Sequence, residues 1–298
     1  MAAPRLGFIG FGEAGPAIAG GLSEEGVEGI EAYDILQTAP QGRALIEARA
    51  NLTGVKLSQS PAELADRREI IISAVTCADA VDAARSVAPH LSPGQYYLDV
   101  NSVSPQTKKA VGEVIEASGA AFVEASIMSP IHPNRHKSPM LFCGPAAPAL
   151  IERLSVYGMN LEDMGPEFGR ASATKMFRSI IFKGIEALMQ ECVVAADQYG
   201  VAEKVLDSVG ENYPELDWNA LASYFIGRSV MHGERRAHEM EEVAETLRAM
   251  DMQPFMAEAA AKRIAWLGRQ NLKEAFNGQE PETYQEVLAA INLKRDTT

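Results

Sequence analysis

Short apolar runs alternate with helix-like stretches over the first half of the chain, up to about residue 165. The run at residues 69–75 is almost continuously apolar, as expected of a parallel strand that is buried on both faces. Further strands are predicted at residues 6–9, 29–33, 55–57, 95–100, 121–125 and 140–144. Strands and helices that alternate at this spacing predict an α/β Rossmann domain, a doubly wound and mostly parallel sheet.

The pattern changes after residue 169, where helical periodicity dominates up to the C-terminus. One long helix is predicted at residues 171–200, closed by Gly200, and others at residues 235–250, 258–275 and 282–293. We therefore expect a nucleotide-binding Rossmann domain at residues 1–168 and an all-α domain for substrate binding and dimerisation at residues 169–298.

A glycine motif, Gly10-x-Gly12-x-x-Gly15, follows the first predicted strand and precedes a helix. In such a turn the glycines permit a tight bend, the approach of a pyrophosphate and close helix–strand packing. Asp34 lies 19 residues after Gly15, where a carboxylate accepts hydrogen bonds from an adenosine ribose. The predicted cofactor contacts are Gly10, Phe11, Gly12, Glu13, Ala14, Gly15, Asp34, Val75 and Thr76.

Asp34 also favours NAD over NADP, because a carboxylate repels the 2′-phosphate of NADP. Ile35 and Leu36 supply no arginine, and Arg43 is nine positions away. NAD is therefore the expected cofactor, and NADP the less favoured one.

Polar residues follow several predicted strands, at residues 73–76, 99–105 and 124–137, and others open the long helix at residues 169–179. Lys175, Ser179 and Lys183 are four residues apart and share one helix face. A lysine beside such loops can exchange a proton with a substrate oxygen. Partial burial and the nearby cations Arg178 and Lys183 are expected to lower its pKa toward the neutral range.

The chain resembles the β-hydroxyacid dehydrogenase family, which includes the 3-hydroxyisobutyrate and 6-phosphogluconate dehydrogenases. Residues 7–15 match its opening fingerprint, and residues 99–105 are similar to its substrate loop, Asp-x-Ser-Thr-x-x-Pro. Residues 124–130 take the place of its Asp-Ala-Pro-Val-Ser-Gly-Gly motif. Gly169 followed by Lys175 matches the end of its Gly-x-Gly-x-x-x-Lys helix start.

The resemblance implies an oxidoreductase that moves a hydride between nicotinamide and the alcohol carbon of a small, anionic β-hydroxyacid-like substrate. Lys175 then takes the position of the catalytic acid/base, and the expected substrate contacts are Asn101, Ser102, Ser129 and Ser179. The chain departs from the family pattern where Ser179 replaces an asparagine and where Ser129-Pro130 replaces a glycine pair.

Two other functions stay open at this point. Imine reductases use a similar fold, but they usually lack a lysine at the position of Lys175. A non-catalytic NAD-binding regulatory protein is compatible with Ser179 and with Ser129-Pro130.

The composition of the chain limits the classes of partner that it is expected to bind. The 298 residues include 40 acidic and 27 basic side chains, and the net charge of −13 argues against nucleic acid. The chain shows neither a membrane-length apolar run nor a signal-peptide pattern, which predicts a cytoplasmic protein without a membrane partner. His132 and His136 lack a metal-ligand pattern, so no metal is expected. The helix-rich second half predicts a homodimer or a larger assembly.

Overall fold

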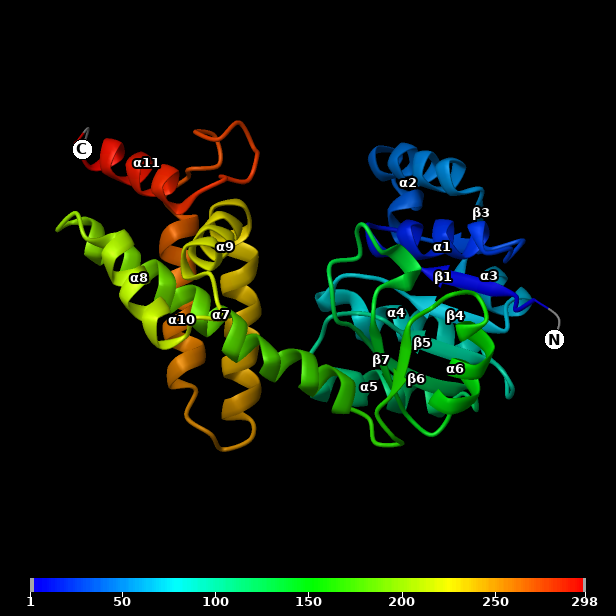
Figure 1. The fold of residues 1–298 in the computed structure, drawn as a ribbon. Coiled ribbons are helices and arrows are strands. Elements are labelled where there is room, and N and C mark those ends of the chain that lie inside the picture. Colours follow the sequence, from blue (N-terminus) through cyan, green and yellow to red (C-terminus); the bar gives the residue numbers. More distant parts are fainter. Residues whose placement is uncertain (1–2, 297–298) are drawn as a thin grey trace. The chain divides into compact units, whose positions relative to one another are not determined.

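The computed structural model describes residues 3–296 and divides the chain into two compact units, Met1–Lys175 and Met176–Thr298. The domain boundary predicted after residue 168 stays a prediction. Figure 1 shows a sheet wrapped by helices in the N-terminal half and helices alone in the C-terminal half.

The sheet of the first unit has the strand order β3-β2-β1-β4-β5-β6-β7-β8 among the described residues. Neighbouring strands are parallel except β6 and β7, which are antiparallel. The strands are β1 (Leu6–Ile9), β2 (Glu31–Tyr33), β3 (Lys56–Leu57), β4 (Ile70–Ser73), β5 (Tyr96–Asp99), β6 (Ala121–Ile127), β7 (Met140–Cys143) and β8 (Leu161–Asp163).

Successive strand residues face opposite sides of the sheet and build two cores. Ile70 and Ile72 belong to one buried cluster, and Ile71 belongs to the other. The first cluster includes residues of α1 (Ala14–Glu24), α2 (Pro40–Thr53) and α6 (Ala147–Ser155). The second includes residues of α3 (Pro61–Arg67), α4 (Ala80–Val87) and α5 (Pro105–Glu116). Four short 3₁₀ segments among the described residues are η1 (Ile35–Thr38), η2 (Cys77–Asp79), η3 (Ala88–His90) and η4 (Arg135–Lys137).

Helices are the only regular secondary structure among the described residues of the second unit. The long helix α7 (Arg170–Asp197) begins in the first unit and continues into the second. It is followed by α8 (Ala202–Asn212), α9 (Trp218–Arg248), α10 (Phe255–Gly268) and α11 (Tyr284–Asp296). A β-carbon at Gly233 would lie 2.8 Å from the Cα of Gly268, so α9 and α10 meet backbone to backbone.

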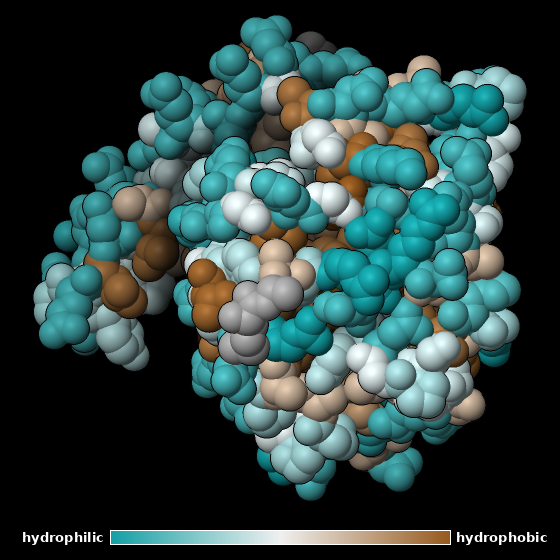
Figure 2. Space-filling model, turned by 90° about the vertical axis from the view of Figure 1, so that its right-hand side faces the viewer, coloured by the Kyte–Doolittle hydropathy of each residue, from teal (hydrophilic) through white to brown (hydrophobic). Residues whose placement is uncertain are grey.

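The predicted fold class is confirmed. The structure differs from the prediction in individual strands and helices. The edge strand β8, the helix α8 and the first half of α9 are absent from the sequence prediction. The helix expected at residues 258–275 ends earlier, at Gly268. None of the described helices is long and apolar enough to cross a membrane. The face shown in Figure 2 is mostly hydrophilic, with small apolar areas among the polar residues.

Candidate active site

The glycine turn between β1 and α1 has the geometry that its sequence predicts. Gly10 has a φ of +86°, and a β-carbon there would lie 2.5 Å from the carbonyl oxygen of Ala74. A β-carbon at Gly15 would lie 2.8 Å from the carbonyl oxygen of Gly10, so this glycine permits close packing of the turn. A β-carbon at Gly12 would meet no atom within 4 Å. The backbone at Gly12 therefore faces the open space that a dinucleotide phosphate requires.

Asp34 follows the last residue of β2, next to this turn. Its Oδ2 accepts a hydrogen bond from the backbone N–H of Phe11 at 2.6 Å, and its Oδ1 accepts one from Leu36 at 2.9 Å. The carboxylate thereby fixes the glycine turn to the end of β2. Each oxygen retains a further lone pair, so the carboxylate can still accept hydrogen bonds from ribose hydroxyls. The turn and Asp34 together fit a dinucleotide, and Glu13 and Ala14 stand at the start of α1, where predicted.

Asn101 connects the ends of β4 and β5 and is 3% exposed. Its Oδ1 accepts from the N–H of Val75 at 2.7 Å, and its Nδ2 donates to the Oγ of Ser73 at 2.9 Å. Both ends of the amide are thus engaged within the protein. Asn101 supports the strand ends in this structure, and its predicted contact with substrate stays a prediction.

Thr76, a predicted cofactor contact, lies just after β4. Its hydroxyl donates to the carboxylate of Asp79.

A buried lysine that sequence reasoning missed lies beneath the same strand ends. Lys108 of α5 is fully buried, and its Nζ donates to the carbonyl oxygens of Asp99 at 2.8 Å and Ala125 at 3.0 Å. It also lies 3.2 Å from the Asp99 carboxylate. Burial raises the pKa of Asp99, against the opposing effect of the Lys108 charge. An apolar-faced helix gives no signal that its lysine turns inward.

Glu124 of β6 binds the N-terminus of the long helix α7. Its fully buried carboxylate accepts from the backbone N–H of Ser172 at 2.7 Å and from that of Gly169. The thiol of Cys143 donates to the same carboxylate at 3.2 Å, and burial raises the pKa of this thiol to about 12. A carboxylate at a helix N-terminus satisfies N–H groups that lack partners within the helix and complements the helix dipole.

Lys175 lies in the second turn of α7, and its Nζ donates to the Oγ of Ser102 at 2.6 Å. Ser102 lies in the loop that follows β5, and its side chain is exposed. The structure therefore brings together the predicted acid/base and one of the predicted substrate contacts, which are 73 residues apart.

For the other two predicted substrate contacts, Ser129 and Ser179, the structure records hydrogen bonds within the protein, and their contact with substrate stays a prediction. Ser129 is partly buried in the connection between β6 and β7, where its hydroxyl donates to the carbonyl oxygen of Pro130 at 3.3 Å. Ser179 belongs to the second unit and accepts from the Nζ of Lys183 at 3.5 Å. In the same unit Lys183 pairs with Glu239 at 2.6 Å, and the buried Glu186 pairs with Arg236. The sequence analysis did not anticipate these two ion pairs.

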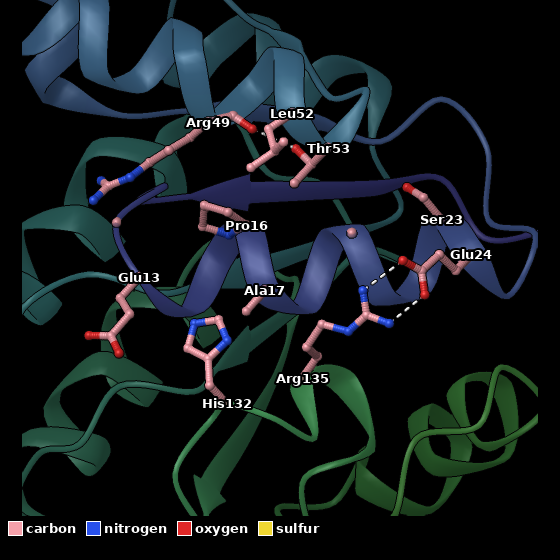
Figure 3. A pocket seen from close by; sticks show the side chains of 12 residues that line it. Glu13, Pro16, Ala17, Ser23, Glu24, Arg49, Leu52, Thr53, His132 and Arg135 are labelled. Atoms are coloured by element: carbon pink, nitrogen blue, oxygen red, sulfur yellow. Dashed lines mark hydrogen bonds and ion pairs between the residues drawn. The ribbon is translucent and has the colours of Figure 1, made fainter.

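A pocket of about 720 Å³ lies along the outer side of α1, within the first unit. Figure 3 shows α1 as its floor, with side chains of α2 on one side and of the β6–β7 connection on the other. The lining residues are Gly12, Glu13, Pro16, Ala17, Gly20, Ser23, Glu24, Arg49, Leu52, Thr53, His132 and Arg135. The pocket thus begins at the glycine turn and runs away from it along α1.

Two cations line this pocket, and sequence reasoning assigned neither to a site. Arg135 is held by Glu24, to which both of its terminal nitrogens donate. Arg49 of α2 donates from Nη1 to the carbonyl oxygen of Phe11 at 3.4 Å, inside the glycine turn. The sequence does contain one signal for Arg49. The chain carries no lysine or arginine from residue 6 to residue 42, so a cation near the glycine turn has to come from a later segment.

His136 is buried against α1 and is 1% exposed. A β-carbon at Gly21 would lie 1.9 Å from its Nδ1, so the ring occupies the space that this glycine leaves. Burial lowers the pKa of His136. Lys137 pairs with Glu25 at 2.6 Å and adds a second attachment of the connection to the end of α1. No group of three or more metal-ligating side chains occurs among the described residues.

Comparisons with known proteins agree with this architecture. Residues 5–144 match the NAD binding domain of 6-phosphogluconate dehydrogenase, and residues 196–267 match a domain of unknown function, DUF1932. An uncharacterized 28.5 kDa protein of Methanothermus fervidus is 30% identical over 253 residues, which cover 85% of this chain and 94% of that protein.

Two solved structures are similar over nearly the whole chain. A conserved hypothetical protein from Sinorhizobium meliloti has a TM-score of 0.82 and 37% identity, with 96% of this chain and 95% of that chain covered. The conserved protein MTH1747, described as structurally similar to 3-hydroxyacid dehydrogenases, has a TM-score of 0.75 and 32% identity, covering 92% and 98%. The chain therefore belongs to the 3-hydroxyacid dehydrogenase-like family, in the branch that includes MTH1747.

Proposed function

We propose that the chain is an NAD-preferring dehydrogenase that acts on the alcohol carbon of a small, anionic β-hydroxyacid-like substrate. The observation that carries this proposal is the 2.6 Å hydrogen bond from Lys175 to Ser102, at the end of a sheet that bears a dinucleotide-binding turn. An amine and a hydroxyl at this distance form a pair that can bind a substrate hydroxyl and transfer its proton.

The nicotinamide cofactor would supply the hydride chemistry, and the chain supplies position and proton transfer. The glycine turn and Asp34 would hold the dinucleotide. Ser102 would accept or donate a hydrogen bond to the substrate oxygen, and Lys175 would take up or return the proton of that oxygen. Glu124 supports this arrangement from below, because it fixes the N-terminus of the helix that carries Lys175.

Lys175 also separates this proposal from its alternatives. An imine reductase-like enzyme does not require a lysine at this position, and a regulatory NAD-binding protein does not require proton transfer. The decisive experiment is a turnover screen of small hydroxyacids with NAD, followed by Lys175→Ala on each substrate that reacts. We expect turnover to fall by about 100-fold or more, the usual effect of removing a general acid/base.

NAD affinity should change little in Lys175→Ala, because the glycine turn and Asp34 bind the cofactor. Lys175→Arg should not restore turnover, since a guanidinium does not lose its proton at accessible pH. Near-normal turnover in Lys175→Ala would remove this lysine from the mechanism. A screen in which no hydroxyacid reacts while NAD binds would favour the regulatory function.

A further inference from the structure

The nucleotide-binding segment of the chain is acidic. Between residues 6 and 34 it carries six carboxylate side chains, including Glu13 and Asp34, and no lysine or arginine. A dinucleotide brings a negatively charged diphosphate to this segment. The N-terminus of α1 offers backbone N–H groups and a partial positive charge, but it supplies no full cation.

The nearest cations in sequence after this segment are Arg43 and Arg49, both on α2. Arg43 is exposed, and its Nε donates at 2.9 Å to the carbonyl oxygen of Gln37, at the other end of the η1–α2 connection. Arg49 instead reaches the glycine turn itself, where it donates to the carbonyl oxygen of Phe11 at 3.4 Å.

Phe11 places Arg49 close to the predicted ribose ligand as well. The N–H of Phe11 donates to Asp34 at 2.6 Å, while its carbonyl oxygen accepts from Arg49. Both side chains therefore meet the same residue between the first two glycines of the motif. In Figure 3 the guanidinium of Arg49 extends beyond the start of α1, on the same side as Glu13.

The guanidinium of Arg49 is only partly engaged. Its contact with Phe11 is a long hydrogen bond to a neutral acceptor, and it forms no ion pair with any carboxylate in the described part of the chain. The other arginine that lines the pocket, Arg135, is bound on both terminal nitrogens by Glu24. An arginine presents five N–H donors in a planar fork, which matches the oxygens of a phosphate.

We infer that Arg49 is a phosphate contact of the bound dinucleotide and supplies the cation that the segment of residues 6–34 lacks. The inference rests on the cofactor-binding part of the proposed function and is independent of the hydride transfer. Two groups of the cofactor could be the partner of Arg49: the diphosphate that NAD and NADP share, and the 2′-phosphate of NADP.

The test is calorimetric titration of the full chain with NAD⁺, NADP⁺, adenosine 5′-diphosphate and adenosine 2′,5′-bisphosphate. Arg49→Ala should weaken binding by about tenfold, the effect expected for one charge-assisted contact. Arg49→Lys should lose less, because it keeps the charge without the fork. Arg49→Gln provides a second neutral variant in case the alanine variant folds poorly. Arg85→Ala, at an exposed site in the last turn of α4, is the matched loss of one arginine and should bind as wild type does.

The pattern of losses identifies the phosphate. Weaker binding of NAD⁺, NADP⁺ and adenosine 5′-diphosphate assigns Arg49 to the diphosphate. A loss restricted to NADP⁺ and adenosine 2′,5′-bisphosphate assigns it to the 2′-phosphate. Unchanged affinity for all four ligands in folded Arg49→Ala and Arg49→Gln overturns the inference and leaves the proposed function intact. A wild-type chain that binds neither NAD⁺ nor NADP⁺ overturns both.

Discussion

Gly21→Ala should destabilise the first unit, although alanine is a better helix former than glycine. The new methyl group would lie 1.9 Å from Nδ1 of the buried His136, far inside contact distance. Helix propensity favours the substitution by about 1 kcal/mol. Overpacking of this kind costs about 1–3 kcal/mol, and more if the ring leaves its site. Because the overlap is severe, we expect a cost in the upper part of this range, about 2–3 kcal/mol, and therefore a net loss of about 1–2 kcal/mol in the free energy of unfolding.

Gly20→Ala is the matched control, because it makes the same chemical change one residue earlier in α1. Its methyl group would lie 3.3 Å from Cγ2 of Thr53 and meet little else, so this variant should gain stability by about 0.5–1 kcal/mol. Combining Gly21→Ala with His136→Ala should remove the clash, so that the new methyl group no longer destabilises the helix.

Urea unfolding followed by two signals provides the assay. Both tryptophans, Trp218 and Trp266, lie in the second unit, so their fluorescence reports on that unit, whereas circular dichroism reports on both. The effect of Gly21→Ala should appear in the circular dichroism transition that the first unit contributes. A Gly21→Ala variant as stable as Gly20→Ala would show that His136 does not depend on the space above Gly21.

Three further outcomes are expected. Wild-type protein should bind NAD more tightly than NADP, and Asp34→Ala should narrow this gap in direct titrations; a wild-type preference for NADP would show that Asp34 is not the ribose ligand. Glu124→Gln should lower the free energy of unfolding by about 1–3 kcal/mol, because one amide –NH₂ would face a backbone N–H that now donates to a carboxylate; an unchanged urea midpoint would contradict this. Light scattering should give the mass of at least two chains, because the described part of α7 exposes Ile181 and Leu188; a monomer at micromolar concentration would refute it.

The fold was predictable because its strongest signals are local. The continuous apolar run at residues 69–75 and the glycine motif at residues 10–15 each specify one local structure, and the structure contains both. The short edge strand β8 has little apolar content, since Glu162 and Asp163 are exposed, and so its sequence resembles a loop. Its pairing with β7 is a tertiary effect that local patterns do not encode.

The positions of Asp34 and Lys175 could be predicted because each lies beside a recognisable element, the strand β2 and the start of α7; their roles toward cofactor and substrate stay predictions. The site was not predictable where a side chain lies in an environment that is rare for its residue type. Lys108 is a residue type that is almost always exposed, yet it is fully buried because backbone carbonyl oxygens and Asp99 surround its ammonium group. Arg49 was missed because its partner, the carbonyl oxygen of Phe11, lies 38 residues away.

The antiparallel pairing of β6 with β7 has a consequence for how such proteins diverge. Because β7 runs opposite to β6, the connection between them begins and ends on the same side of the sheet. This is the side at which the carboxyl ends of β1, β4 and β5 lie. A loop with both ends at one edge can gain or lose residues without shifting the register of either strand, and lengthening it costs little in closure entropy. In this chain its first residue, Met128, already donates its N–H to the carbonyl oxygen of Pro139 at 2.8 Å, which closes the base of the loop. The loop can therefore diverge in length and sequence while the strands on either side of it keep their register.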